Sequence, residues 1–147
     1  MEETRTERQL RDILQSNPAI YDWVFTRDVR IDAQSVPRSH PVLVLNTRHL
    51  GDDHQLAAAF VHEQLHWGIR PIEQPLLCEL EQRYPDLPIG PPDGCRTRFS
   101  NYLHLVICSL EYRSLITLLG PAAALATLQR ATHYRRIYQT VTLTPTA

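Results

Sequence analysis

The residues with the clearest chemical meaning are two histidines and a glutamate, in the order His-Glu-Gln-Leu-His at positions 62–66. On an α-helix, residues four apart lie on the same face, so His62 and His66 can bind one metal ion. Zn²⁺ accepts imidazole nitrogens, and catalytic zinc sites use about three protein ligands and keep one position open. Glu63 is turned about 100° from His62, and its longer side chain can reach a metal-bound water. The spacing therefore predicts a zinc site with Glu63 as general base.

The alternative is that these three polar side chains are solvated on a helix surface. Their surroundings argue against it, because segment 54–67 contains no proline or glycine and is apolar on almost all sides. Such a helix is typical of a protein interior. Buried polar side chains without partners cost on the order of several kcal/mol. A metal ion and its water would provide those partners.

A third ligand must come from elsewhere, and the apolar segment 97–119 offers His104 and Glu111. They are seven positions apart, so on a helix they share one face at about 10.5 Å along the axis. That separation makes it difficult for both to bind one ion. We expect Glu111 to be the ligand, because a carboxylate among apolar neighbours needs a cation. His104 would then stabilise a developing oxyanion, or would itself be the ligand.

With a His-Glu-x-x-His segment followed by a glutamate on a later helix, the chain resembles the zincin metallopeptidases, most closely the small gluzincins. The resemblance implies a zincin-like core with His62, His66 and Glu111 as zinc ligands and Glu63 as the base. It also implies a strand on the rim of the cleft, for which segment 42–45 is the candidate. A substrate peptide would add beside that strand.

The chain departs from the patterns of these peptidases at two positions. Many gluzincins have an aspartate four residues after the glutamate ligand, where it holds a ligand histidine, and here that position is Leu115. The longer metzincin pattern needs another histidine six residues after His66, and here that position is Ile72. The resemblance therefore covers the motif, the strand before it and one helix after it.

Segment 133–138 offers a further candidate, because Tyr134 or Tyr138 could donate a hydrogen bond to an oxyanion. The alternative is an amphipathic helix end whose arginines lie near the C-terminal dipole. We include Tyr134, with Glu63 and His104, among the predicted catalytic residues.

Composition narrows the class of protein. The chain has 147 residues, the expected size of a single domain (1–147), with 15 basic residues, none of them lysine, against 16 acidic ones. This balance gives no electrostatic footprint for nucleic acid. We expect no membrane span and no signal peptide, because no apolar run has the required length. Three widely spaced cysteines favour a reducing, cytoplasmic location.

The elements that must position these residues follow from periodicity and from breaker residues. We expect an α-dominated α+β fold with a small sheet. The predicted strands are 23–31 and 42–45, and the tail 140–147 is either a strand or irregular. The predicted helices are 3–16, 54–67 (begun by an aspartate cap and ended by Gly68), 76–83, 97–119 and 122–138, with 85–95 irregular.

Two functions remain open at this level. The first is a zinc metallopeptidase acting on peptides or proteins through a zinc-activated water and Glu63. The second is a non-enzymatic domain stabilised by zinc, in which both His104 and Glu111 complete a closed site of four protein ligands. The first function uses Glu63 as a general base, whereas the second gives Glu63 no role.

Overall fold

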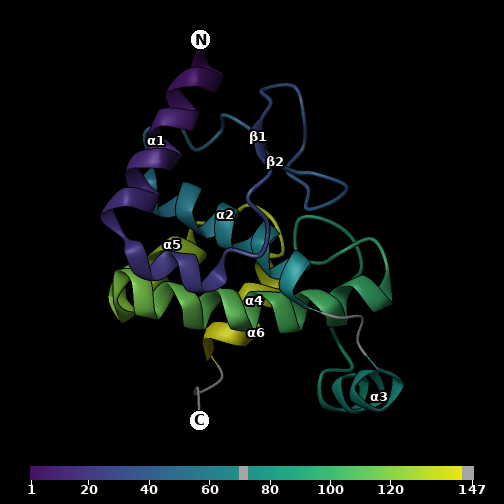
Figure 1. Ribbon diagram of the computed structural model, residues 1–147. Helices are drawn as coiled ribbons and strands as arrows, with labels where there is room; N and C mark the ends of the chain where they lie inside the picture. Colours follow the sequence, from purple (N-terminus) through teal and green to yellow (C-terminus); the bar gives the residue numbers. More distant parts are fainter. Residues whose placement is uncertain (70–72, 144–147) are drawn as a thin grey trace.

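Helices dominate the computed structural model, which describes residues 1–69 and 73–143 (Figure 1). Two short parallel strands form the sheet, so the predicted α+β class is confirmed. The elements in chain order are α1 (Glu2–Ser16), the 3₁₀ turn η1 (Pro18–Trp23), β1 (Val29–Ile31), β2 (Leu43–Leu45), α2 (Asp53–Gly68), α3 (Gln74–Arg83), α4 (Arg98–Leu119), α5 (Pro121–Gln129) and α6 (Arg135–Leu143).

The two apolar helices predicted from the sequence, α2 and α4, pack against each other at the centre of the fold. The long α4 runs beneath α2 and also packs against α5 and α6 (Figure 1). By length and mean hydropathy α4 would also suffice to cross a membrane, but here 44% of its most apolar window is buried inside the protein. Its apolar side chains thus serve packing in this fold.

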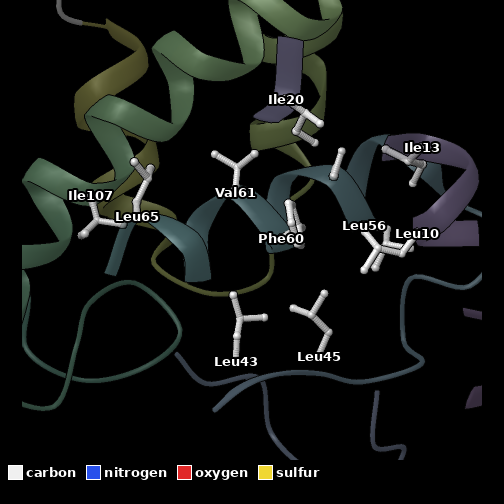
Figure 2. Packing of buried hydrophobic residues seen from close by; sticks show 11 residues of the cluster. Leu10, Ile13, Ile20, Leu43, Leu45, Leu56, Phe60, Val61, Leu65 and Ile107 are labelled. Carbon is white, nitrogen blue, oxygen red and sulfur yellow. The ribbon is translucent and has the colours of Figure 1, made fainter. Parts of the chain in front are cut away.

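The sheet and α1 pack against α2 on the side away from α4 (Figure 1). In Figure 2, Leu43 and Leu45 of β2 point toward α2, and Phe60 lies on the helix surface that faces them. All three side chains are at most 2% exposed. Burial of a large apolar side chain stabilises a fold by about 1.5–3 kcal/mol, so this layer fixes the position of the helix that carries the histidines.

Polar contacts fix both ends of α2. Asp52 accepts a hydrogen bond from the backbone N–H of Gln55 at 3.2 Å, which confirms the predicted aspartate cap. Near the other end, the fully buried Gln64 accepts from the backbone N–H groups of Phe25 (2.7 Å) and Thr26 (2.9 Å) and donates to the Thr26 carbonyl (2.7 Å). The amide therefore attaches segment 24–26 to the helix.

Several boundaries differ from the prediction. Gly68 is the last residue of α2 rather than the residue that ends it, and a Cβ there would collide with the ring of Phe25. The predicted strand 23–31 is reduced to β1, because Trp23 ends η1. The proposed strand or tail at 140–147 is wrong up to Leu143, which ends α6, and positions 144–147 lie outside the described residues.

The predicted helix 122–138 is wrong, because two helices occupy this part of the chain. Gly120, at φ 85°, ends α4, and Pro121 opens α5. A break at 130–134 then separates α5 from α6. It contains Tyr134, at φ 53°, a left-handed conformation that is uncommon for a residue with a side chain. The break matters because it turns Tyr134 toward α2 and α4.

Strand β2 has backbone partners on both sides. It pairs in parallel with β1, in a register that sets Val29 beside Leu43. On its other side, Val44 exchanges two backbone hydrogen bonds with Arg38, at 2.8 and 3.0 Å. We expected a substrate strand to add at this edge of β2. At Val44 the edge is instead paired with Arg38, which belongs to the segment before β2.

Candidate metal centre

Three histidines converge between α2 and α4. His62 and His66 come from successive turns of α2, as the motif predicts, and His104 comes from α4. One potential ligand atom from each lies within 4.8 Å of the other two. The ring centroids are 5.0 to 5.4 Å apart. Such a set of imidazole nitrogens suits Zn²⁺.

The environment of His104 determines which nitrogen is free. Its Nδ1 lies 2.9 Å from the backbone carbonyl of Ser100, one turn earlier in α4. A carbonyl can only accept, so Nδ1 carries the proton and Nε2 keeps its lone pair. His104 is thus oriented by its own helix with a metal-binding nitrogen free.

His62 is oriented by a charged partner. Its Nδ1 lies 2.9 Å from Oε2 of Glu111, and the hydroxyl of Tyr138 donates to the same oxygen at 2.8 Å. Glu111 is 1% exposed, so these contacts provide the partners that a buried carboxylate needs. Burial by itself lowers the pKa of His62, but the charge and hydrogen bond of Glu111 outweigh it and raise the pKa. This arrangement also leaves Nε2 of His62 as the nitrogen facing away from the carboxylate.

The other two imidazoles are held neutral. Burial, together with the neighbouring His62 and His104, lowers the pKa of His66 to about 3. Burial and His62 lower the pKa of His104 to about 4. Burial is the larger cause, because it disfavours the charged form, and repulsion between neighbouring protonated imidazoles adds to it. Neutral imidazoles are the form that binds a metal.

Glu63 lies on the wall of a cavity of about 290 Å³ together with His62. Burial raises the pKa of this carboxyl, with a further rise from Glu111 and an opposing effect of His62. Among the residues that the structure describes, the lining also includes Tyr134 and Tyr138 but neither His66 nor His104. Glu63 is thus the carboxylate of the motif that faces open space.

Tyr134 covers two of the histidines. Its ring stacks on His104 at a centroid distance of 4.4 Å and on His62 at 5.5 Å. Burial raises the pKa of its hydroxyl well above the usual range, so the group stays protonated and can donate a hydrogen bond. The left-handed backbone at Tyr134 is the local strain that permits this stacking.

A second group of potential ligands lies deeper, formed by His62, Cys108 and Glu111. All three residues are buried. Burial raises the pKa of the Cys108 thiol well above its usual value, and Glu111 raises it further. Since metals bind the thiolate, this group is less suited to a metal than the group of three imidazoles, in which His66 and His104 are held neutral.

The structure places Glu111 and His104 differently from the expectation. The expected ligand set of His62, His66 and Glu111 is not one of the two groups that the described residues form. Glu111 contacts Nδ1 of His62, and His104 completes the histidine group. Sequence spacing placed His104 and Glu111 on one face of one helix, but it could not show which of them lies level with His66.

Comparison of the chain with protein-family models, curated proteins and solved structures gives no match.

Proposed function

We propose that the chain is a zinc-dependent metallopeptidase of zincin type, in which His62, His66 and His104 hold the metal. The observation that carries the proposal is the convergence of three imidazoles, two of them with Nδ1 occupied and Nε2 free, beside a glutamate on a cavity wall. A bound Zn²⁺ would supply Lewis acidity that activates water and polarises a carbonyl.

Glu63 acts in this proposal as general base and then as general acid. It takes the proton of the attacking water and passes it to the amine that leaves. Its raised pKa favours this exchange, because a carboxyl nearer to the working pH both accepts and returns a proton more readily. Its place on the cavity wall supports the role, because a substrate enters through open space.

Tyr134 is the proposed oxyanion donor. It is protonated and stacked on two of the three histidines, so its hydroxyl is held near the reaction centre. In this arrangement His104 is a ligand, and Tyr134 stabilises the oxyanion. Glu111 is a positioning residue, which holds the ring of His62 and adds negative charge beside it.

Replacement of Glu63 by glutamine tests the proposal. The zinc-loaded protein is incubated with a mixture of quenched fluorogenic peptides, and zinc affinity is measured in parallel by competition with a chelating dye. We expect Glu63→Gln to keep zinc affinity and to lose hydrolysis by at least about 100-fold. The matched control is Glu79→Gln on the exposed side of α3, which should leave both unchanged.

Two outcomes would contradict the proposal. Equal hydrolysis by the wild type and Glu63→Gln would show that Glu63 is not the general base. A protein that binds zinc, unfolds when the zinc is chelated and cleaves no peptide would instead be a zinc-stabilised domain with a closed site.

A further inference from the structure

The cavity wall that carries Glu63 also carries two arginines, Arg48 and Arg130. Arg130 already has a counter-charge, because its Nη1 lies 2.8 Å from Oδ2 of Asp52. Across residues 1–69 and 73–143, no carboxylate lies within ion-pair distance of Arg48. Of the two arginines on the cavity wall, Arg48 is therefore the one that has no anionic partner among the described residues.

A neutral histidine holds Arg48 in place. Nε of Arg48 donates to Nε2 of His49 at 3.1 Å. Burial and the charge of Arg48 lower the pKa of His49 to about 4, so the imidazole accepts this hydrogen bond without a charge of its own. The contact orients the guanidinium and leaves its positive charge uncompensated.

The remaining acidic groups of the cavity wall are engaged elsewhere. Asp52 pairs with Arg130, and Glu111 contacts His62 and Tyr138. Glu63 is the carboxylate that the proposed reaction uses, and it lines the same cavity as Arg48. Arg48 and Glu63 thus line one cavity, in which a substrate group next to the cleaved bond would lie.

The size and lining of the cavity limit what can bind. A volume of about 290 Å³ is at the small end for ligand sites. Ala58, Ala59 and Leu128 contribute apolar wall, and Arg48 is among the charged groups of the lining. This arrangement suits one side chain or a chain end that carries a single charge.

We propose that Arg48 binds a carboxylate of the substrate beside the cleaved bond, so that the site prefers acidic peptides. This inference rests on the proposed function and names its substrate class. Arginine binds carboxylates through two parallel hydrogen bonds, which combine charge with geometric selectivity. The carboxylate is either that of an aspartate or glutamate side chain or the free C-terminus of a peptide.

Binding, rather than cleavage, provides the test. The zinc-loaded Glu63→Gln protein is titrated into fluorescently labelled alanine hexapeptide amides with glutamate at each position in turn, and binding is followed by anisotropy. The comparison peptides carry glutamine at the same positions, and one further alanine peptide has a free C-terminal carboxylate. We expect at least one acidic peptide to bind about five- to tenfold more tightly than its neutral counterpart.

Variants of Arg48 connect this preference to the guanidinium. Arg48→Gln should remove the preference, and Arg48→Lys should keep part of it. Arg11→Gln, on the exposed side of α1, is the matched control and should keep all of it. A preference confined to the free C-terminus identifies the chain end as the bound group, and one for glutamate identifies a side chain.

The outcomes separate this inference from the proposed function. Equal binding of acidic and neutral peptides, no binding of any of them, or an unchanged preference in Arg48→Gln would overturn the role of Arg48. If the wild type cleaves peptides without an acidic preference, the peptidase stands and the inference falls. If acidic peptides bind through Arg48 and are never cleaved, the inference stands and the peptidase falls.

Discussion

Nδ1 of His62 lies 2.9 Å from Oε2 of Glu111, although the two residues are 49 positions apart and belong to different helices. Both side chains are almost completely buried, at 7% and 2% exposure. A carboxylate that holds one nitrogen of a histidine while the other nitrogen faces a cluster of imidazoles is typical of metal sites. In the proposed metal site, this contact would give Glu111 a function that does not require it to touch the metal.

The first prediction separates a ligand from a positioning residue. Glu111→Gln keeps the shape of the side chain but loses its charge, so zinc affinity should fall by about 10- to 100-fold. His104→Ala removes a ligand and should reduce affinity by more than about 100-fold. Competition with a chelating dye measures both, and His54→Ala on the exposed side of α2 serves as control. If Glu111→Gln is the more damaging change, Glu111 and not His104 is the ligand.

The second prediction concerns the chemical step. Tyr134→Phe keeps the ring that stacks on His104 and His62 but removes the hydroxyl. We expect kcat to fall by about 100-fold, as for other oxyanion donors, while zinc affinity and KM change little. Steady-state kinetics on a cleaved peptide give this comparison. A wild-type kcat in this variant would show that the hydroxyl of Tyr134 does not stabilise the oxyanion.

The third prediction concerns the attachment of segment 24–26 to α2. Gln64→Leu leaves two backbone N–H groups and one carbonyl without the partners they have in the fold. Each buried polar group without a partner costs about 1–3 kcal/mol, so the free energy of unfolding should fall by about 3 kcal/mol. Urea denaturation measures it. Gln82→Leu, on the exposed side of α3, is the matched control and should change stability little, and an equally small effect of Gln64→Leu would contradict this explanation.

The structure shows how far sequence reasoning reaches and where it stops. The spacing of His62 and His66 and the apolar character of the two long segments predicted α2 and α4, because helical periodicity is local. The contact between His62 and Glu111 could not be predicted, since it depends on how the two helices are staggered. The missed features, such as the hydrogen bonds of Gln64, also join segments that are distant in the sequence.

The error at 122–138 has a different cause. The segment contains neither proline nor glycine, so its pattern indicates one continuous helix. The break instead depends on tertiary contacts. The backbone N–H of Arg135 donates to the carbonyl of Pro92, and that of Arg136 donates to the carbonyl of Asp93, at 3.1 and 3.0 Å. Tyr134 gains its stacking partners from the same rearrangement, so the prediction failed at a residue of the candidate site, where local preference is overridden.

The fourth prediction concerns pH and the partner of Arg48. Burial and the charges of Arg48 and Arg130 lower the pKa of His49 to about 4, against an opposing effect of Asp52. The imidazole is therefore protonated more readily in the unfolded chain. The contribution of His49 to the free energy of unfolding is therefore complete above about pH 6.5, and it is lost as the pH falls toward 4.

Titration of the histidine ring protons by NMR measures this pKa directly, with His49→Gln used to assign the signal. We expect Arg48→Gln to raise the pKa of His49, because it removes a nearby positive charge. A wild-type value near 6.5 would show that the contact between Arg48 and His49 does not persist in solution.

A crystal structure of the zinc-loaded protein, with anomalous scattering recorded at the zinc absorption edge, tests the proposed metal centre directly. We expect one strong peak between α2 and α4, about 2.0–2.1 Å from Nε2 of His62, His66 and His104, with Glu111 still bound to Nδ1 of His62. A peak held by Glu111 in place of His104, or by Cys108 and Glu111 beside His62, would contradict it.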